Sequence, residues 1–149
     1  MIIIRPWLFI GKYRETQNLP LLHENNIQAM LQFEDLVEQP SILSLYLPIT
    51  DGEPLRPEIL KQGIDFMLRN YHQNKTLFVS CGAGISRSAT FIIATLKETE
   101  NLSLLNAYQS LKEFHPGALP HPALWQSLNQ YYQENIPYWQ LLKEYNQSY

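Results

Sequence analysis

The chain has 149 residues, of which 45% are hydrophobic and 17% are charged, as in an ordinary soluble globular protein. This length suits one domain with a full hydrophobic core, so we expect residues 1–149 to form a single domain. The net charge of −3 argues against a nucleic-acid binder, because affinity for a phosphate backbone needs a basic face. The one cysteine excludes an intramolecular disulfide, a CxxC redox pair and a cysteine-rich zinc site.

The N-terminal stretch MIIIRPWLFIG is apolar, but Arg5 and Pro6 split it. It lacks the order of segments that defines a signal peptide. No apolar run in the chain approaches the ~20 residues that a membrane-spanning helix needs. Together with the single thiol, these features predict a cytoplasmic protein with no membrane partner.

Short apolar or alternating segments predict strands, and the patterns between them predict helices. The predicted strands are WLFIG (7–11), QAMLQF (28–33), LSLYLPI (43–49) and TLFVS (76–80). Residues 18–26 have Asn18 as a plausible N-cap and Pro20 in the first turn of a helix. Residues 56–73 place a row of apolar side chains on one helical face, namely Ile59, Leu60, Ile64, Met67, Leu68 and Tyr71.

After Cys81 the patterns predict helices only. These are residues 87–100, residues 103–114 with Ser103 as the N-cap, and residues 121 to about 146 with a break near Pro137. Strands that alternate with helices indicate an α/β sandwich. We therefore expect a central, mostly parallel sheet of four to five strands, flanked by helices, and an all-helical C-terminal half. Sites in such folds lie beyond the C-terminal ends of the strands, which is where Cys81 and Asp51 are expected.

The segment CGAGISRS (81–88) has the features of an anion-binding cradle. The glycines at 82 and 84 allow successive N–H groups to point inward, and the N-terminus of the next helix adds free donors. Arg87, six residues after Cys81, can fold its planar guanidinium over two oxygens of a phosphate. A thiol at the rim of that field ionises readily and is a nucleophile.

An isolated cysteine in this position would more often be a small buried hydrophobe at the end of a core strand. The combination of strand, cysteine, five intervening residues, arginine and helix favours the cradle instead. The segment also resembles the C-x5-R-S/T signature of cysteine-dependent protein phosphatases, and AGISRSAT resembles the dual-specificity phosphatase family in particular. Similar stretches are WLFIG with Asn18-Leu19, YLPITD, and the region 107–128, so the resemblance implies one catalytic domain over residues 1–149.

The resemblance implies a role for each residue of the signature. Cys81 would attack phosphorus and form a phosphocysteine, and Ser88 would help the thiolate leave. Asp51 would protonate the leaving oxygen and then assist water. No metal or cofactor is implied, because the cradle supplies the positive charge. The phosphate would be bound by Arg87 and by the loop residues Gly82, Ala83, Gly84, Ile85 and Ser86.

The assignment of the acid has rivals. Asp51-Gly52 is a common turn pair, which is the structural alternative for Asp51. Its position after a predicted core strand favours catalysis. Glu53 is the nearest rival, whereas Glu34 and Asp35 follow an earlier strand and are less favoured.

Two departures from the family pattern matter. Ser80 stands where the family usually has histidine, which implies a less readily formed thiolate and a lower turnover. His115-Pro116 stands where the family often has Arg-Pro, and we expect this histidine to be structural. We expect His121 to cap the last helix.

The sequence therefore predicts a phosphatase that acts on phosphotyrosine and phosphoserine or phosphothreonine in proteins or peptides. The loop between Cys81 and Arg87 contains no lysine, which disfavours a highly charged lipid headgroup. One alternative is a pseudophosphatase that binds phosphorylated partners without turnover, and Ser80 is its only support. Another is a rhodanese-like sulfurtransferase, although that family has a shorter loop suited to sulfur.

The C-terminal segment is rich in aromatic side chains. Packing on the core explains the helical spacing of Trp125, Leu128 and Tyr132, and a weak self-association face is the alternative. The aromatic residues are Trp125, Tyr131, Tyr132, Tyr138, Trp139, Tyr145 and Tyr149.

Overall fold

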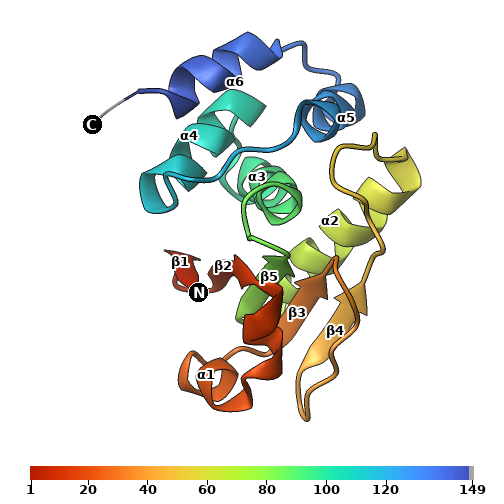
Figure 1. Cartoon of the computed structure of the whole chain (residues 1–149), viewed down its shortest axis with the longest axis vertical. Coiled ribbons are helices and arrows are strands. Elements are labelled where there is room, and N and C mark those ends of the chain that lie inside the picture. Colours follow the sequence, from red (N-terminus) through yellow and green to blue (C-terminus); the bar gives the residue numbers. More distant parts are fainter. Residues whose placement is uncertain (148–149) are drawn as a thin grey trace.

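A five-stranded sheet with the order β1-β2-β5-β3-β4 organises the computed structural model, which describes residues 1–147 (Figure 1). The first two strands pair antiparallel, and all other pairs are parallel. The predicted mostly parallel sheet is thus confirmed. The strands are β1 (Ile2–Arg5), β2 (Leu8–Lys12), β3 (Ala29–Gln32), β4 (Leu43–Tyr46) and β5 (Leu77–Cys81).

Helices follow the strands in the predicted order. The predicted caps are present, because the side chains of Asn18 and Ser103 accept hydrogen bonds from the backbone N–H groups of Leu21 and Asn106, both at 3.1 Å. No helix within residues 1–147 is long and apolar enough to cross a membrane. The helices are the 3₁₀ helix η1 (Tyr13–Gln17), α1 (Leu19–Glu24), α2 (Pro57–His72), α3 (Arg87–Glu100), α4 (Leu104–Phe114), α5 (Pro122–Tyr132) and α6 (Tyr138–Tyr145).

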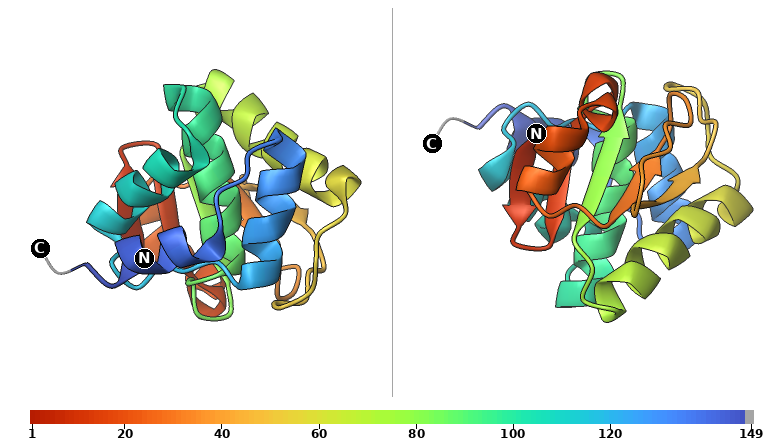
Figure 2. Two further views of the ribbon diagram at one scale, coloured as in Figure 1. Left: turned by 90° about the horizontal axis from the view of Figure 1, so that it is seen from above. Right: turned by 90° about the horizontal axis from the view of Figure 1, so that it is seen from below.

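The two faces of the sheet are covered unequally. Side chains alternate along β5, so Leu77 and Val79 join the large core beneath the C-terminal helices, whereas Phe78 joins a small cluster with Leu22 of α1. Figure 2 shows α3 along the middle of the large helical layer, with α4 on one side of it and α5 on the other. The small cluster is covered by α1 on the opposite face (Figure 1).

Three details differ from the sequence predictions. β1 was not among the predicted strands, and β4 ends at Tyr46, before Pro48, although the pattern extended to 49. The C-terminal helix separates into two: α5 ends at Tyr132 because Gln133 is left-handed, with φ 55°, and α6 begins after Pro137. The predicted break near Pro137 is confirmed, but the interruption is longer than expected. Tyr149 lies outside the described residues.

The parallel strands bring several loops to one edge of the sheet. β2, β3, β4 and β5 all end at this edge, at Lys12, Gln32, Tyr46 and Cys81. The segments that follow these strand ends are therefore neighbours in space, although they lie far apart in the sequence.

Candidate active site

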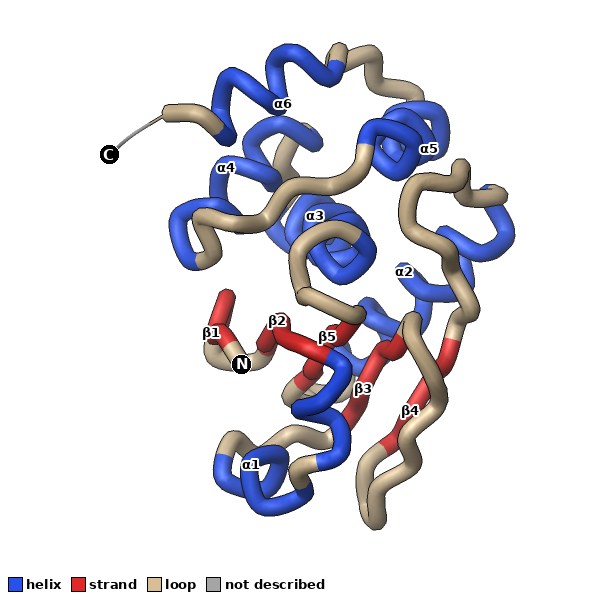
Figure 3. Tube along the Cα trace, viewed as in Figure 1, coloured by secondary structure: helices blue, strands red, loops and turns tan. Residues whose placement is uncertain are grey.

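Cys81 is the last residue of β5, the central strand of the sheet. The backbone of β5 pairs Cys81 with Lys12 of β2, and it pairs Ser80 with Gly11 and with Gln32 of β3. Residues 82–86 then form a loop, and α3 begins at Arg87. Figure 3 shows this loop as a tan arch that joins β5 to the first turn of α3. The predicted strand–loop–helix junction is confirmed.

Glycine is required at position 84 of the loop for two reasons. Gly84 has a φ of +69°, a left-handed conformation that side-chain-bearing residues rarely adopt. A Cβ atom added there would also lie 2.6 Å from the carbonyl oxygen of Gly11. The loop is thus folded tightly against the end of β2.

The segment after α4 supports the loop from the outside. Nε2 of His115 lies 2.8 Å from the carbonyl oxygen of Gly84, and the N–H of Leu119 donates to the carbonyl of Ile85 at 3.0 Å. His115 therefore contacts the backbone of the loop, as a structural role predicts. No feature of the sequence identifies Gly84 as its partner.

The guanidinium of Arg87 is held by two loops from neighbouring strands. Its Nη1 donates to the carbonyl oxygen of Ile49 at 3.0 Å, and its Nη2 is bonded to the carboxylate of Glu34. Arginine has five N–H donors, so this arrangement fixes the plane of the group and leaves three N–H donors for another anion.

Asp51 faces the same hollow as Arg87. Oδ1 of Asp51 accepts a hydrogen bond of 2.7 Å from the hydroxyl of Ser86, which itself accepts from the backbone N–H of His121 at 2.9 Å. A carboxylate and a guanidinium thus lie at one opening beside the loop. The hollow has a volume of about 490 Å³ and is lined by Phe33, Glu34, Tyr46, Pro48, Ile49, Thr50, Asp51 and Arg87.

The structure separates the rival acids from one another. Glu53 lines an adjoining hollow with Leu55 and Arg56, and it is not among the residues that line the one that contains Arg87. Glu34, ranked low as an acid from the sequence, does reach the loop. Its Oε1 would lie 3.0 Å from a Cβ atom at Gly82. The available signal for Glu34 was its place directly after a predicted strand.

Cys81 and Ser88 are both nearly inaccessible to solvent. Cys81 is 3% exposed, and Ser88, in the first turn of α3, is fully buried. The hydroxyl of Ser88 has no hydrogen-bond partner within the described residues. A buried hydroxyl without a hydrogen-bond partner costs about 1–3 kcal/mol of stability. An acceptor that enters the loop, or that forms there when a thiol ionises, would therefore be stabilised by this hydroxyl.

His121 caps α5 as predicted. Its Nδ1 accepts a hydrogen bond from the N–H of Ala123 at 3.1 Å, and the helix begins at Pro122. Because the His121 N–H also donates to Ser86, this cap connects the start of α5 to the candidate acid through one hydroxyl.

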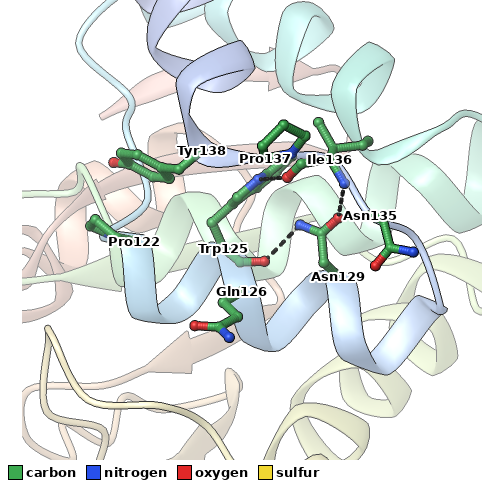
Figure 4. A pocket seen from close by; sticks show the side chains of 8 residues that line it. All are labelled: Pro122, Trp125, Gln126, Asn129, Asn135, Ile136, Pro137 and Tyr138. Carbon is green, nitrogen blue, oxygen red and sulfur yellow. Dashed lines mark hydrogen bonds between the residues drawn. The ribbon is translucent and has the colours of Figure 1, made fainter.

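Another hollow, of about 400 Å³, lies between α5 and the segment that leads into α6 (Figure 4). Three of its polar side chains, those of Trp125, Asn129 and Tyr138, bond to the protein's own backbone. Trp125 Nε1 donates to the carbonyl of Ile136 at 2.8 Å, and Asn129 bonds to the N–H of Ile136 and the carbonyl of Trp125. The predicted packing of Trp125 on the core is confirmed.

Tyr138, which lines this hollow, donates its hydroxyl hydrogen to the carbonyl of Pro120 at 2.6 Å. Burial and the negative charge of Asp51 together raise the pKa of the Tyr138 phenol. Tyr138 is therefore a neutral donor that ties α6 to the start of α5.

Comparison with known proteins points to one family. The model of the dual specificity phosphatase catalytic domain matches residues 8–134. Human dual specificity protein phosphatase 16 is 32% identical over 124 residues, which cover 79% of this chain and 18% of that protein. Mouse dual specificity protein phosphatase 19 is 26% identical over 137 residues, which cover 87% of this chain and 60% of that protein.

A solved structure agrees with this result. The crystal structure of human DUSP28 matches with a TM-score of 0.81 and 25% identity, and the match covers 89% of this chain and 96% of that one. The predicted α/β architecture is therefore that of a known fold. The chain spans less than two thirds of the length of the curated relatives described above.

Proposed function

This chain belongs to the dual-specificity phosphatase family, and we propose that residues 1–149 form one catalytic domain that hydrolyses phosphomonoesters in proteins through a phosphocysteine. The substrates would be phosphotyrosine and phosphoserine or phosphothreonine. The observation that carries the proposal is the meeting of Arg87 and Asp51 in one hollow beside the loop that starts at Cys81.

In the first step, the thiolate of Cys81 attacks phosphorus and a new S–P bond forms. The P–O bond to the substrate residue breaks, and Asp51 gives its proton to the departing oxygen. The three equatorial oxygens of phosphorus are held by Arg87 and by the backbone N–H groups of residues 82–87. The tight fold of the loop around Gly84 supports this role, because those N–H groups then need not reorganise during the reaction.

In the second step, water attacks the phosphocysteine, and Asp51 takes a proton from that water. The S–P bond breaks and releases inorganic phosphate and the thiolate of Cys81. The hydroxyl of Ser88 donates a hydrogen bond to the leaving sulfur. Within residues 1–147 the hydroxyl of Ser88 has no hydrogen-bond partner, which supports this role, because a thiolate in the loop would supply one.

The binding-only alternative rests on Ser80 alone. Ser80 is buried at the end of β5, so it changes the support of the cradle and not the set of reacting groups. A thiol, an arginine and a carboxylate are all retained. We therefore propose a working enzyme whose turnover is lowered by Ser80.

We further propose that the protein works in the cytoplasm and that α6 contributes to weak self-association. The single cysteine supports the first proposal. The second is supported by Trp139, whose side chain is 61% exposed on α6. Sedimentation of wild type and of the Trp139→Ser variant would test it. If the dimer forms through this face, loss of the tryptophan contact should weaken it, so the variant dimer should dissociate at a higher protein concentration than the wild-type dimer. Equal dissociation of the two proteins would contradict the proposal.

The direct test of the enzymatic proposal is the hydrolysis of para-nitrophenyl phosphate as a function of pH. Wild type should release phosphate continuously, and Cys81→Ser should be inactive while it keeps the same thermal unfolding midpoint. Equal rates for the two proteins would exclude a covalent mechanism through Cys81. Tight binding of a phosphopeptide by wild type, with no phosphate released in a single turnover, would instead establish the binding-only alternative.

A further inference from the structure

Two hollows border the candidate cradle, and Glu34 lines both of them. The first contains Arg87 and Asp51 and is described above. The second has a volume of about 400 Å³ and is lined by Lys12, Tyr13, Arg14, Glu34 and Gly82. A peptide whose phosphate occupies the cradle would therefore place neighbouring residues over the second hollow.

The second hollow differs from the first in charge. Neither Lys12 nor Arg14 forms an ion pair with a carboxylate of residues 1–147, and both side chains are exposed. The nearest acid in the sequence, Glu15, accepts a hydrogen bond of 2.8 Å from the backbone N–H of Lys12 and pairs with the Met1 ammonium. Glu34 is paired with Arg87. Two cations at this opening thus lack a compensating charge.

The register of the sheet places these cations beside the candidate nucleophile. Lys12 is the residue of β2 that pairs with Cys81, and adjacent strands are about 4.8 Å apart. Arg14 lies in η1, which directly follows β2 and contacts β5 (Figure 1). An extended peptide advances about 3.3 Å per residue, so the side chains one or two positions from the phosphoresidue are within reach of this hollow.

We propose that Lys12 and Arg14 form a second anion subsite, which binds a carboxylate or a second phosphate on a residue near the phosphoresidue being cleaved. This inference rests on the proposed function of the cradle and names the class of substrate: acidic or doubly phosphorylated segments of protein. Arg14 offers a planar fork that can bind two oxygens, and Lys12 adds a point charge. Tyr13 also lines this hollow.

The test compares phosphotyrosine peptides of one sequence that differ only in their neighbours. One peptide has alanine at every position within two residues of the phosphotyrosine. Others carry a single glutamate or a single phosphoserine at each of those positions. For wild type at low ionic strength, we expect kcat/KM for the best anionic peptide to exceed that for the alanine peptide by about 10-fold, as expected for one or two charge-assisted contacts.

The double variant Lys12→Ala/Arg14→Ala should reduce this preference to about 2-fold or less, and it should leave para-nitrophenyl phosphate hydrolysis within about 2-fold of wild type. The matched control is Arg69→Ala/Lys75→Ala, which removes the same charge near the end of α2 and before the start of β5, whereas the cradle follows the end of β5. This control should keep the full preference. A preference for phosphoserine alone would indicate doubly phosphorylated segments, and an equal preference for glutamate would indicate acidic ones. Both results support the subsite.

A binding measurement separates this inference from the proposed function. Fluorescence anisotropy with the Cys81→Ser variant should show the same preference, again lost when Lys12 and Arg14 are replaced. If no peptide is hydrolysed but this binding preference is present, the subsite stands and the enzymatic proposal fails. The inference is overturned if no position of the second anion improves binding or hydrolysis, or if the preference survives in the double variant as well as in the control.

Discussion

The hollow between α5 and α6 and the hollow beside the cradle have similar volumes, but their polar groups have different partners. The hollow between α5 and α6 measures about 400 Å³, and the one beside the cradle measures about 490 Å³. In the first, Trp125 and Asn129 bond to nearby backbone groups of the same C-terminal segment. In the second, Arg87 and Asp51 come from different parts of the chain, and three N–H donors of Arg87 are free for an anion.

We therefore expect the hollow between α5 and α6 to contribute to stability and the hollow beside the cradle to take part in the chemistry. Polar groups that already bond to the protein fix a local conformation and have little left to offer a ligand. At the edge of the sheet, charged groups from different loops keep unused hydrogen-bond donors, so we expect them to bind a ligand from solution. Substitutions in the first hollow should therefore change the free energy of unfolding, and substitutions in the second should change the catalytic rates.

The largest effect should come from Arg87→Lys. Lysine keeps the charge but loses the planar fork, so kcat for para-nitrophenyl phosphate should fall about 10³-fold, a loss of about 4 kcal/mol of transition-state stabilisation. Arg69→Lys on the exposed face of α2 is the matched control and should be unchanged. A loss of less than tenfold in Arg87→Lys would mean that this side chain does not bind the reacting phosphate.

The next effect should come from Asp51→Asn, and it should depend on the leaving group. An alkyl phosphate needs its oxygen protonated, so its kcat/KM should fall about 100-fold, whereas an activated aryl phosphate should lose much less. Glu53→Gln, in the neighbouring hollow, should change neither rate appreciably. If Glu53→Gln showed the leaving-group dependence instead, the acid would have to be reassigned.

Trp125→Phe should affect stability and spare activity. The change removes the Nε1 bond to Ile136 and part of a buried ring, and should lower the free energy of unfolding by about 1–2 kcal/mol. Urea unfolding measures this loss, and kcat of the folded protein should stay within about 2-fold of wild type. A large fall in kcat with unchanged stability would remove the distinction drawn between the two hollows.

The smallest effect should come from Glu34→Gln. The Glu34 carboxylate occupies Nη2 of Arg87 and so competes with an incoming phosphate for it. Removing the charge should tighten competitive inhibition by inorganic phosphate about 2- to 5-fold, because the pair is partly exposed and each such pair is weak. A tenfold fall in kcat with unchanged phosphate inhibition would show that Glu34 positions Arg87 instead.

Most of the fold could be predicted from the sequence because its signals are local. Apolar runs predicted four of the strands, and Asn18 and Ser103 marked the helix starts that they do cap. The strand β1 was not predicted, because its apolar run is short and ends at Arg5 and Pro6. The early end of α5 at Gln133 escaped because a left-handed glutamine carries no signal of the kind that glycine gives.

The site was only partly predictable, for a physical reason. Residues 81–88 are contiguous, so their spacing alone indicated a phosphate cradle. Glu34, Lys12 and Arg14 reach it through the parallel register of β2, β3 and β5, which depends on strand order and not on sequence spacing. Ser86, which bonds to Asp51, was predicted only as part of the phosphate-binding loop.

The most direct test of the account is to trap the intermediate. Asp51→Ala should still accept phosphate from an activated aryl ester, but it should hydrolyse the product slowly, because the group that activates water is missing. After rapid acid quenching, intact-mass and peptide-mass measurements should find one added phosphoryl group, located on Cys81 and absent in Asp51→Ala/Cys81→Ser. Turnover of the ester with no phosphoryl group on Cys81 at any quench time, or with the group on another residue, would contradict the proposed mechanism.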